Sequence, residues 1–361
     1  MNEVKILHVI ARMNVGGTAR YLDELVRNIP GSALATGYVQ DGEIEDPVIS
    51  DLLIYRIKDL GRKISLTKDV KSWFELRKLV NELQPAILHT HTFKAGLIGR
   101  LIRGKHKHVH TFHGHLLDDD SFSSLKLAVI ILLERYLAKK TDLLVSVGDR
   151  VGLELREIGI GTNLKWCSIP PGVYKLPVEN RLDAREKLGL DPHRTYVGWI
   201  ARITAVKNPF LLLEVARELP QIQFLMAGGG DLLGLVTKQA PANVSILGWC
   251  EAATFFSSVD CVISTSNNEG MPIALIEAQL AGIPVVATAV GSNAEVIQDG
   301  VTGIIVEKNV KALSQALTDV LSRRIASIAN SEEIASIAEI QFSPNKMIKR
   351  HIEKYSELFQ K

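Results

Sequence analysis

Short runs rich in β-branched residues alternate with amphipathic stretches along the whole chain, and the alternation recurs in both halves. Such strand–helix alternation is typical of a parallel sheet that carries helices on both faces. At 361 residues the chain is too long for one ordinary core. The sequence therefore predicts an α/β protein with two doubly wound parallel-sheet domains and a final helix.

Periodicity places the expected elements. The expected strands are 5–10, 35–39, 54–57, 86–90, 109–112 and 143–147, and then 195–200, 222–227, 244–247, 261–265, 284–287 and 302–306. The expected helices are 18–28, 67–83, 93–102, 122–138 and 149–158, and then 207–218, 231–239, 251–257, 272–281, 309–321 and 346–359.

The domain boundary is expected at Ile169–Val173, where two prolines and a glycine interrupt the pattern. This boundary gives an N-terminal domain of residues 1–172 and a C-terminal domain of residues 173–343. Residues 344–361 form a terminal helix that we expect to pack back on the N-terminal domain. Two facing domains of this kind leave a cleft at the carboxyl ends of their strands, where ligands bind.

Composition excludes several classes of protein. The formal net charge is only +2, which does not suit a nucleic-acid binder. Three cysteines without a CxxC spacing exclude a disulfide scaffold and a zinc module, and favour the cytoplasm. The longest apolar run, 127–133, is far shorter than the 20 or so residues that cross a bilayer.

Charge is unevenly distributed, because residues 1–175 carry 25 Lys and Arg against 20 Asp and Glu. A cluster within this basic half comprises Arg100, Arg103, Lys105 and Lys107, interleaved with His106 and His108. The cluster is interpreted either as a solvated helix end or as a patch that faces an anionic membrane or acceptor.

Gly16 and Gly17 lie between the first expected strand and the following helix. Two glycines there let backbone amides approach a ligand, and a helix N-terminus favours a phosphate. A simple tight turn is an equally good interpretation of the pair. Neither a GxGxxG fingerprint nor a P-loop is present.

Five histidines gather at the ends of two expected strands: His89, His91, His110, His113 and His115. Histidine is a common zinc ligand, but the sequence has no HExxH and no cysteine partner nearby. We therefore expect no metal, and interpret the histidines as loop residues that hydrogen-bond a substrate. His113 is the best placed of them, because it directly follows the strand 109–112.

The strand-to-helix loop after residue 200 contains Arg202 and Lys207. Isolated cationic side chains usually lie on the protein surface and bind no specific ligand. Beside a helix N-terminus, however, a guanidinium that binds bidentately and an ammonium point charge are suited to a diphosphate.

The most specific motif runs from Glu269 through Gly270, Met271 and Pro272 to a second acid, Glu277. The motif follows a strand, and Pro272 suits the first turn of the next helix. Glu277 lies among apolar helix residues, where a carboxylate is costly without a partner. A surface acid at a helix N-terminus explains one glutamate but not the pair.

This constellation resembles the retaining nucleotide-sugar glycosyltransferases of family four, which have the GT-B fold of two facing Rossmann-like domains. The resemblance covers essentially the whole chain. It includes Ile169–Val173 and the segments 227–231, 248–249 and 289–295. Thr18 departs from the family's glycine loop by adding a side chain, and Pro171 stands where asparagine is common.

The resemblance implies a role for each matching residue. Arg202 and Lys207 would bind the donor diphosphate, and Glu277 the ribose hydroxyls. Glu269 and the backbone of Gly270, Met271 and Pro272 would bind the donor sugar. From the first domain, His113 would contact the transferred sugar, and Gly16 and Gly17 would close over the phosphates.

The resemblance also implies front-side attack, with a donor phosphate oxygen helping to deprotonate the acceptor and with no metal or other cofactor. The implied activity is transfer from a UDP-sugar, with UDP-N-acetylhexosamine first, to a lipid-linked or polysaccharide acceptor of the bacterial cell surface. The expected location is the cytoplasm, including the inner face of the membrane. The alternatives are GDP-mannose as donor, a soluble acceptor, a UDP-sugar 2-epimerase or a phosphorylase of the same fold, and a non-catalytic sugar-nucleotide sensor. Asp118–Asp120 imitates a metal-binding DxD motif but is interpreted as a solvated loop.

Overall fold

A computed structural model describes residues 5–40, 43–61, 65–114, 124–325 and 327–360 of the chain. The chain divides into two compact units, each with its own parallel sheet. Unit 1 comprises Met1–Gly172 together with Pro344–Lys361, and unit 2 comprises Val173–Ser343. The predicted fold class of two doubly wound α/β domains with a C-terminal helix is confirmed.

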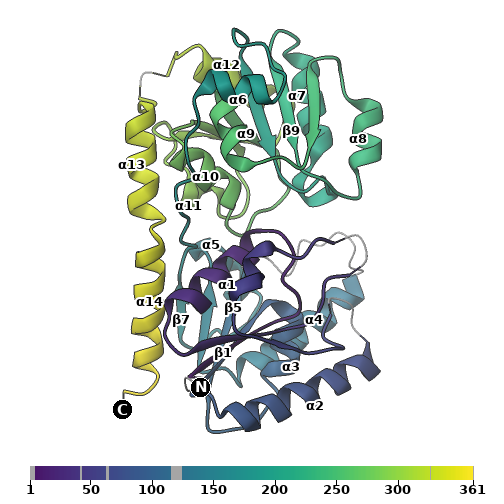
Figure 1. Cartoon of the computed structure of the whole chain (residues 1–361), viewed down its shortest axis with the longest axis vertical. Coiled ribbons are helices and arrows are strands. Elements are labelled where there is room, and N and C mark those ends of the chain that lie inside the picture. The colour runs from purple at the N-terminus through teal and green to yellow at the C-terminus, as the bar shows by residue number, and fades with distance from the viewer. Residues whose placement is uncertain (1–4, 41–42, 62–64, 115–123, 326, 361) are drawn as a thin grey trace. The chain divides into compact units, whose positions relative to one another are not determined.

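Unit 1 contains a seven-stranded sheet in the order β3-β2-β1-β4-β5-β6-β7. Figure 1 labels β1, β5 and β7 of this sheet. Its strands are β1 (Ile6–Ile10), β2 (Ser32–Thr36), β3 (Ile54–Arg56), β4 (Ile87–His91), β5 (Lys107–Phe112), β6 (Leu143–Ser146) and β7 (Trp166–Ser168). Its helices are α1 (Gly17–Asn28), the 3-10 helix η1 (Pro47–Asp51), α2 (Leu66–Leu83), α3 (Thr92–Gly99), α4 (Ser124–Ala138), α5 (Asp149–Glu157) and α14 (Pro344–Glu357). The strand order reverses between β1 and β4, which makes their carboxyl ends the switch point where ligands bind in such sheets.

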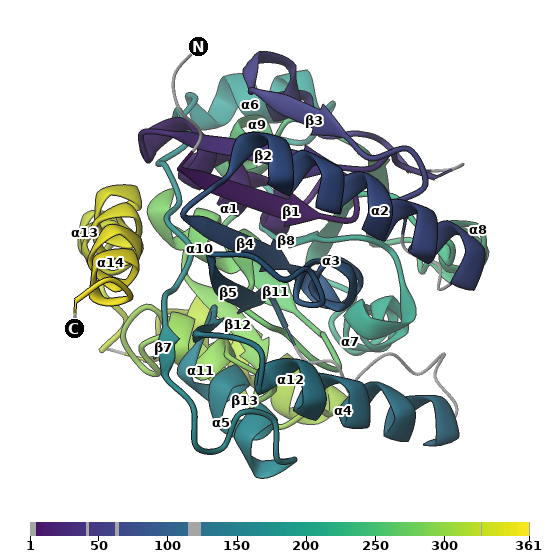
Figure 2. The same cartoon turned by 90° about the horizontal axis from the view of Figure 1, so that it is seen from below.

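Helices cover both faces of this sheet. On one side α3 packs on β1, β4 and β5 with α2 and α4 beside it (Figure 2). Leu7 and Val9 point to this side and pack with Leu76 of α2 and Ile98 of α3. Because side chains alternate along a strand, His8 and Ile10 point to the other side, where α1 lies.

Unit 2 contains a six-stranded parallel sheet in the order β10-β9-β8-β11-β12-β13. Its strands are β8 (Tyr196–Ile200), β9 (Gln223–Ala227), β10 (Val244–Gly248), β11 (Cys261–Ser264), β12 (Val285–Thr288) and β13 (Gly303–Val306). Its helices are α6 (Arg181–Lys187), the 3-10 helix η2 (Ala205–Lys207), α7 (Pro209–Glu218), α8 (Leu233–Gln239), α9 (Ala252–Ser258), α10 (Ile273–Leu280), α11 (Asn293–Val296), α12 (Val310–Leu321) and α13 (Ser331–Gln341). Here the switch point lies between β8 and β11.

Some elements differ from their predictions. The strand expected at 35–39 is Ser32–Thr36, because Ser32, Ala33 and Leu34 pair with β1 from Ile6 onward. Pairing is decided by the neighbouring strand, which the local pattern does not contain. The short α6 and the helix α13 were not predicted. Asn330 begins α13 with a capping box that includes Glu333, a signal present in the sequence.

Within the described residues, no helix has both the length and the apolar character needed to cross a bilayer.

Candidate functional site

Lys207 and Glu269 meet at the switch point of unit 2. Lys207 ends η2 in the loop after β8, and Glu269 lies in the loop after β11. The ammonium Nζ of Lys207 lies 2.6 Å and 2.7 Å from the two carboxylate oxygens of Glu269. Glu269 is buried and Lys207 is partly buried, so the pair is shielded from bulk water. The structure thus places two of the predicted site residues in direct contact.

Hydroxyl groups at the end of β11 hold these two loops together. The Thr265 hydroxyl contacts the backbone carbonyls of Lys207 at 3.1 Å and Asn208 at 2.9 Å. The indole N–H of Trp199, in β8, donates to the Thr265 oxygen at 3.0 Å. Ser266 Oγ donates to Glu269 Oε1 at 2.6 Å. The Glu269 carboxylate is therefore fixed by an ammonium and a hydroxyl before any ligand binds.

The loop after β12 also supports Glu269. The Ser292 amide donates to the Glu269 carbonyl at 3.1 Å. Gly291 has a φ of +48°, and a Cβ at this position would lie 1.9 Å from the same carbonyl oxygen. Only glycine can therefore occupy this position without displacing the Glu269 loop.

The residues that follow Glu269 lead into α10. Pro272 is buried and is the N-cap of this helix, while Gly270 and Met271 are half-buried. Within the described residues the amides of Gly270 and Met271 donate to no protein acceptor. Such amides beside a helix N-terminus are suited to oxygen atoms of a ligand. Glu277 is buried farther along α10.

Arg202 lies in the same β8 loop as Lys207 but is exposed to solvent. A guanidinium at the carboxyl end of β8 is chemically suited to an anion bound at the switch point.

In unit 1, Gly16 is exposed and is the N-cap of α1, which begins at Gly17. Gly16 has a φ of +152°, a conformation that side-chain-bearing residues rarely adopt, and a Cβ there would meet nothing within 4 Å. The backbone conformation therefore requires glycine even though space is available. The loop lies at the carboxyl end of β1, beside the switch point of this sheet.

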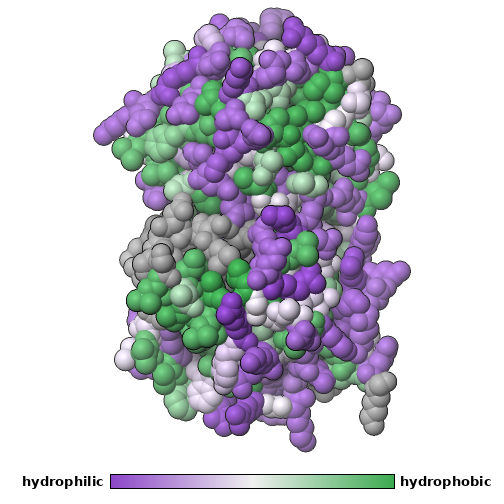
Figure 3. Space-filling view, turned by 180° about the vertical axis from the view of Figure 1, so that it is seen from behind, coloured by the Kyte–Doolittle hydropathy of each residue, from purple (hydrophilic) through white to green (hydrophobic). Residues whose placement is uncertain are grey.

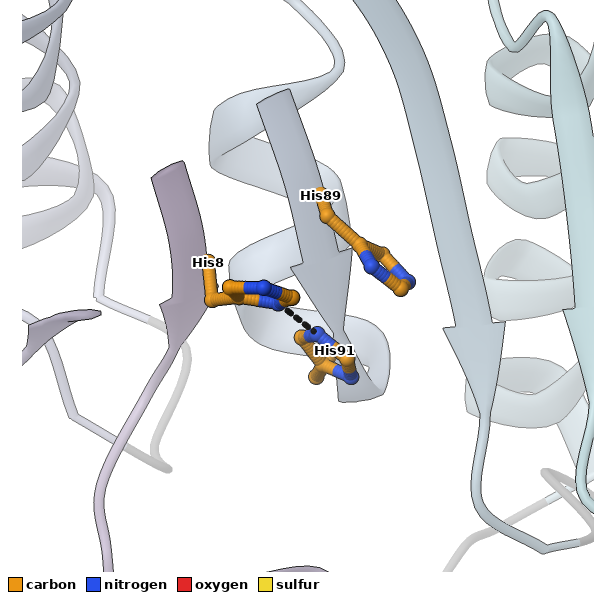
Figure 4. Close-up of side chains that lie close together, drawn as sticks. All are labelled: His8, His89 and His91. Atoms are coloured by element: carbon orange, nitrogen blue, oxygen red, sulfur yellow. Dashed lines mark hydrogen bonds between the residues drawn. The ribbon is translucent and has the colours of Figure 1, made fainter. Parts of the chain in front are cut away.

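Histidine rings extend from that switch point into the interior of unit 1. His8 Nδ1 lies 3.1 Å from His91 Nε2, and His91 Nδ1 lies 3.0 Å from His113 Nε2. Figure 4 shows His8 on β1 facing His91 at the end of β4, with His89 on the same strand. We name His8, His91 and His113 the imidazole chain.

Helix α14 completes this cluster from the other end of the sequence. His351 Nε2 lies 2.7 Å from the Tyr21 hydroxyl, and the Tyr355 hydroxyl lies 2.7 Å from His89 Nδ1. The second nitrogen of His89 lies 2.7 Å from the Thr111 hydroxyl. These polar contacts explain why α14 belongs to unit 1 although it follows unit 2 in the sequence.

Burial keeps these histidines neutral. It lowers the pKa of His8, His113 and His351 to about 3, with neighbouring rings adding to the effect at His351. Burial, assisted by neighbouring imidazoles, also lowers the pKa of His89 and His91 well below its usual value. All five rings are therefore uncharged near pH 7.

His8, His89 and His91 form the one group of potential metal ligands in the described part of the chain, with ligand atoms within 4.8 Å of one another. Both nitrogens of His89 and of His91, and one nitrogen of His8, are engaged in hydrogen bonds. A metal ion would have to break these bonds and bring charge into a fully buried site. Hydrogen bonding is therefore the better explanation of the cluster.

The interpretation of the histidines as substrate-binding loop residues needs correction. His89, His91 and His110 are fully buried within strands β4 and β5. Only His113 follows its strand and is half-buried, as expected of a residue that reaches a ligand. His115 and Asp118–Asp120 lie outside the described residues.

The interpretation of the basic cluster as a charged surface is wrong at Arg100. Its side chain is fully buried, and Nη2 lies 2.7 Å from both carboxylate oxygens of Glu134 in α4. His106 is buried as well, and Lys107 forms an ion pair with Asp142 at 3.3 Å. Arg103 and Lys105 remain exposed. A run of charges in the sequence does not reveal which member finds a partner in another helix.

Comparison with known families matches both units. Residues 16–172 match the family described as Glycosyl transferase 4-like domain, and residues 180–337 match Glycosyl transferases group 1. The chain belongs to the group 1 glycosyltransferases. It is therefore a glycosyltransferase with a nucleotide-sugar donor.

Relatives of this glycosyltransferase include the Escherichia coli enzyme named UDP-Gal:alpha-D-GlcNAc-diphosphoundecaprenol alpha-1,3-galactosyltransferase. That relative is 26% identical over 91% of this chain and 90% of its own length. D-inositol 3-phosphate glycosyltransferase from Mycobacterium sp. (strain KMS) is 31% identical over 66% of this chain and 59% of the relative. HepE from Anabaena, solved in complex with UDP and glucose, has the same fold, with a TM-score of 0.83 and 18% identity over 98% of this chain and 99% of that one.

Several residues that contact the candidate site residues were not predicted. In unit 2 they are Thr265 and Ser266, whose position at the end of an expected strand was the available signal. In unit 1 they are His8, Tyr21 and the α14 residues His351 and Tyr355, whose side chains contact the predicted histidines. No local motif marks these four, because their partners lie up to 330 residues away in the sequence.

Proposed function

We propose that this glycosyltransferase is a retaining enzyme that transfers a sugar from a UDP-sugar to a lipid-linked or polysaccharide acceptor in bacterial cell-surface glycan synthesis. The main support is the contact between Lys207 and Glu269 at the switch point of unit 2. A cation and a carboxylate held side by side suit a ligand that carries both phosphates and hydroxyl groups.

Each group has a role in holding the donor. Lys207 and Arg202 bind the diphosphate, and Glu277 binds the ribose hydroxyls. The Glu269 carboxylate accepts hydrogen bonds from the sugar hydroxyls, and the amides of Gly270 and Met271 donate to sugar oxygens. In unit 1, His113 contacts the transferred sugar and the Gly16–Gly17 loop contacts the phosphates.

The reaction consists of front-side attack by the acceptor hydroxyl on the anomeric carbon as the bond to the diphosphate breaks. A phosphate oxygen of the departing diphosphate takes the acceptor's proton. Lys207 and Arg202 stabilise the negative charge that develops on this leaving group, and Lys207 is held at the switch point before the reaction begins. These cations supply the charge stabilisation that a metal ion gives elsewhere, so the proposed mechanism has no metal or other cofactor.

UDP-N-acetylhexosamine is the first donor to test. The name of the Escherichia coli relative includes UDP-galactose as its donor and a lipid-linked diphosphate as its acceptor. UDP-galactose is therefore the second donor to test, and a polyprenyl-diphosphate-linked sugar is the first acceptor.

A lipid-linked acceptor requires contact with a membrane surface, and α4 has the character of such a contact. Its exposed apolar side chains lie on one helical face, at Leu125, Val129, Leu132 and Tyr136. Figure 3 shows apolar side chains gathered over this part of unit 1. We name these four residues the α4 stripe.

The charges on α4 suit an anionic membrane. Its one acidic residue, Glu134, is buried against Arg100. Arg135 and Lys139 are exposed near its C-terminal end. Exposed apolar side chains beside basic residues can contact the interface of an anionic bilayer. We propose that the enzyme binds peripherally to the inner face of the cell membrane through the α4 stripe.

A transfer assay tests the proposed function. Purified protein is incubated with radiolabelled UDP-N-acetylglucosamine, UDP-galactose or GDP-mannose, with and without a polyprenyl-diphosphate-linked sugar. Acceptor-dependent release of UDP, with an α-linked product, is the expected result. Epimerised donor without transfer would favour the 2-epimerase alternative, and binding without turnover would favour a sugar-nucleotide sensor. A parallel reaction contains D-inositol 3-phosphate as the acceptor, and transfer to this compound alone would favour a soluble acceptor.

A further inference from the structure

Among the described residues, the imidazole chain has a fully buried end at His8 and a half-buried end at His113. His8 and His91 are fully buried, whereas His113 is half-buried and follows the last residue of β5. The inner nitrogen, His8 Nε2, is buried and has no hydrogen-bond partner among the described residues. At the outer end, no described residue contacts His113 Nδ1 by a hydrogen bond, although its Nε2 contacts His91.

Each ring in this chain carries a single N–H, because a neutral imidazole has one donor nitrogen and one acceptor nitrogen. Burial lowers the pKa of His8 and His113 to about 3 and that of His91 well below its usual value. Two ring–ring hydrogen bonds in series then allow only two arrangements. Either every ring donates outward toward His113, or every ring donates inward toward His8.

The buried end distinguishes the two arrangements. If the rings donated inward, the His8 proton would lie on Nε2, as a buried N–H without an acceptor. Orphaned buried N–H groups are rarer in proteins than under-satisfied acceptors. Outward donation leaves only a lone pair at His8 Nε2. The protons then lie on Nδ1 of His8, on Nδ1 of His91 and on Nδ1 of His113.

We propose that His8 and His91 are positioning residues that hold His113 as its Nδ1–H tautomer, so that the open end of the ring presents a hydrogen-bond donor to the sugar. This inference rests on the proposed function, in which His113 contacts the transferred sugar. The two nitrogens of the His113 ring then have different roles. Nε2 accepts a hydrogen bond from His91, and Nδ1 donates one to a sugar oxygen. His113 therefore binds the sugar and does not take the acceptor's proton, which goes to the donor phosphate.

Nitrogen NMR of the whole chain labelled with ¹⁵N-histidine reads the tautomer directly. The His113 signals are assigned by their loss in His113→Gln. The expected spectrum has a protonated Nδ1 and an unprotonated Nε2 for His113 at pH 7. A protonated Nε2 on this ring would overturn the inference. Stoichiometric metal in the purified protein would do the same, because a metal takes the lone pairs that join His8 to His91.

Two substitutions at His8 form a matched pair. The amide nitrogen of Asn can occupy the place of Nδ1, so His8→Asn keeps a donor to His91. His8→Asp provides an acceptor instead, and should reverse the chain so that the His113 proton moves to Nε2. Expected results are a kcat/KM close to wild type for His8→Asn and a kcat/KM about tenfold or more lower for His8→Asp, because the sugar loses the hydrogen bond from His113.

The two variants and the spectra separate this inference from the proposed function. The spectra are recorded without substrate, so they test the tautomer even if no transfer is detected. If the protein transfers sugar while His113 carries its proton on Nε2, the proposed function is supported and this inference is wrong. Equal kcat/KM values in folded His8→Asn and His8→Asp, with the proton moved in the second, would show that the tautomer does not matter and would also overturn it.

Discussion

The Lys207 ammonium lies within 2.7 Å of both carboxylate oxygens of Glu269, although the residues are 62 positions apart. The two residues come from loops on either side of the switch point between β8 and β11. In the proposed mechanism, a diphosphate that binds there competes with Glu269 for Lys207, which frees the carboxylate to accept hydrogen bonds from sugar hydroxyls. The ion pair thus keeps both side chains in place before the donor binds. When the donor binds, Lys207 contacts the diphosphate and Glu269 contacts the sugar.

Removal of either cation should slow transfer. We expect Lys207→Ala and Arg202→Ala each to raise the barrier by about 2–4 kcal/mol, because each stabilises the leaving diphosphate. Steady-state kinetics with the donor identified by the transfer assay measures the effect. Lys311→Ala, an exposed lysine of α12, is the matched control and should retain full activity. An unchanged kcat in Lys207→Ala or Arg202→Ala would remove that residue from the proposed mechanism.

Transfer should persist when divalent metal ions are chelated. The proposed mechanism stabilises the leaving group with Arg202, Lys207 and backbone amides, so EDTA should leave the initial rate close to its untreated value. The rate is compared after dialysis against EDTA and again after addition of Mg²⁺ or Mn²⁺. Loss of transfer that either ion restores would contradict the metal-free mechanism.

Local sequence signals were sufficient where one loop contains the whole motif. Glu269 and Pro272 follow an expected strand, and the structure places them in the loop between β11 and α10. The alternation of strands and helices likewise indicated the parallel sheets, because periodicity is a property of each segment.

Sequence signals were insufficient where a residue's environment depends on a distant segment. Arg100 and Glu134 are 34 positions apart, and nothing near either residue indicates that they pair. His8 and His351 join the histidine cluster only because β1 lies beside β4 and α14 packs on unit 1. A parallel sheet brings such segments together through long crossovers, so these contacts depend on topology.

Loss of Arg100 should destabilise unit 1 instead of weakening a charged surface. Both side chains of the Arg100–Glu134 pair are fully buried, so Arg100→Met leaves an uncompensated carboxylate and should cost about 3–5 kcal/mol. The double variant Arg100→Met/Glu134→Leu should recover most of that loss. Urea unfolding measures both variants. Equal stabilities of the single and double variants would show that the carboxylate is not the cause.

Acid should destabilise unit 1 through its buried histidines. Their folded pKa values lie below the ordinary value of 6.5, at about 3 for His8, His113 and His351, so below pH 6.5 the unfolded chain binds more protons. The free energy of unfolding should therefore fall as the pH drops from 7 toward 3, by up to about 1.4 kcal/mol per pH unit for each ring. His351→Gln should reduce the slope between pH 6 and 5 by about one proton. A slope identical to wild type would contradict the burial of His351 as a neutral ring.

Membrane binding should depend on the α4 stripe and on the basic residues that are exposed to solvent, Arg103 and Lys105. We expect the protein to float with anionic liposomes at low salt and to be released as salt rises, because each engaged basic residue contributes about 1 kcal/mol near such a surface. Leu125→Gln with Leu132→Gln should weaken binding even at low salt, since these side chains are 78% and 67% exposed and bury apolar area in the interface. Arg103→Ser with Lys105→Ser should weaken binding at low salt, because it removes electrostatic attraction. The remaining binding should depend less on salt concentration. Leu235→Gln, at an exposed apolar position of unit 2, is the matched control. If the wild-type protein ignores anionic liposomes even at low salt, the peripheral-membrane proposal fails and a soluble acceptor becomes the better hypothesis.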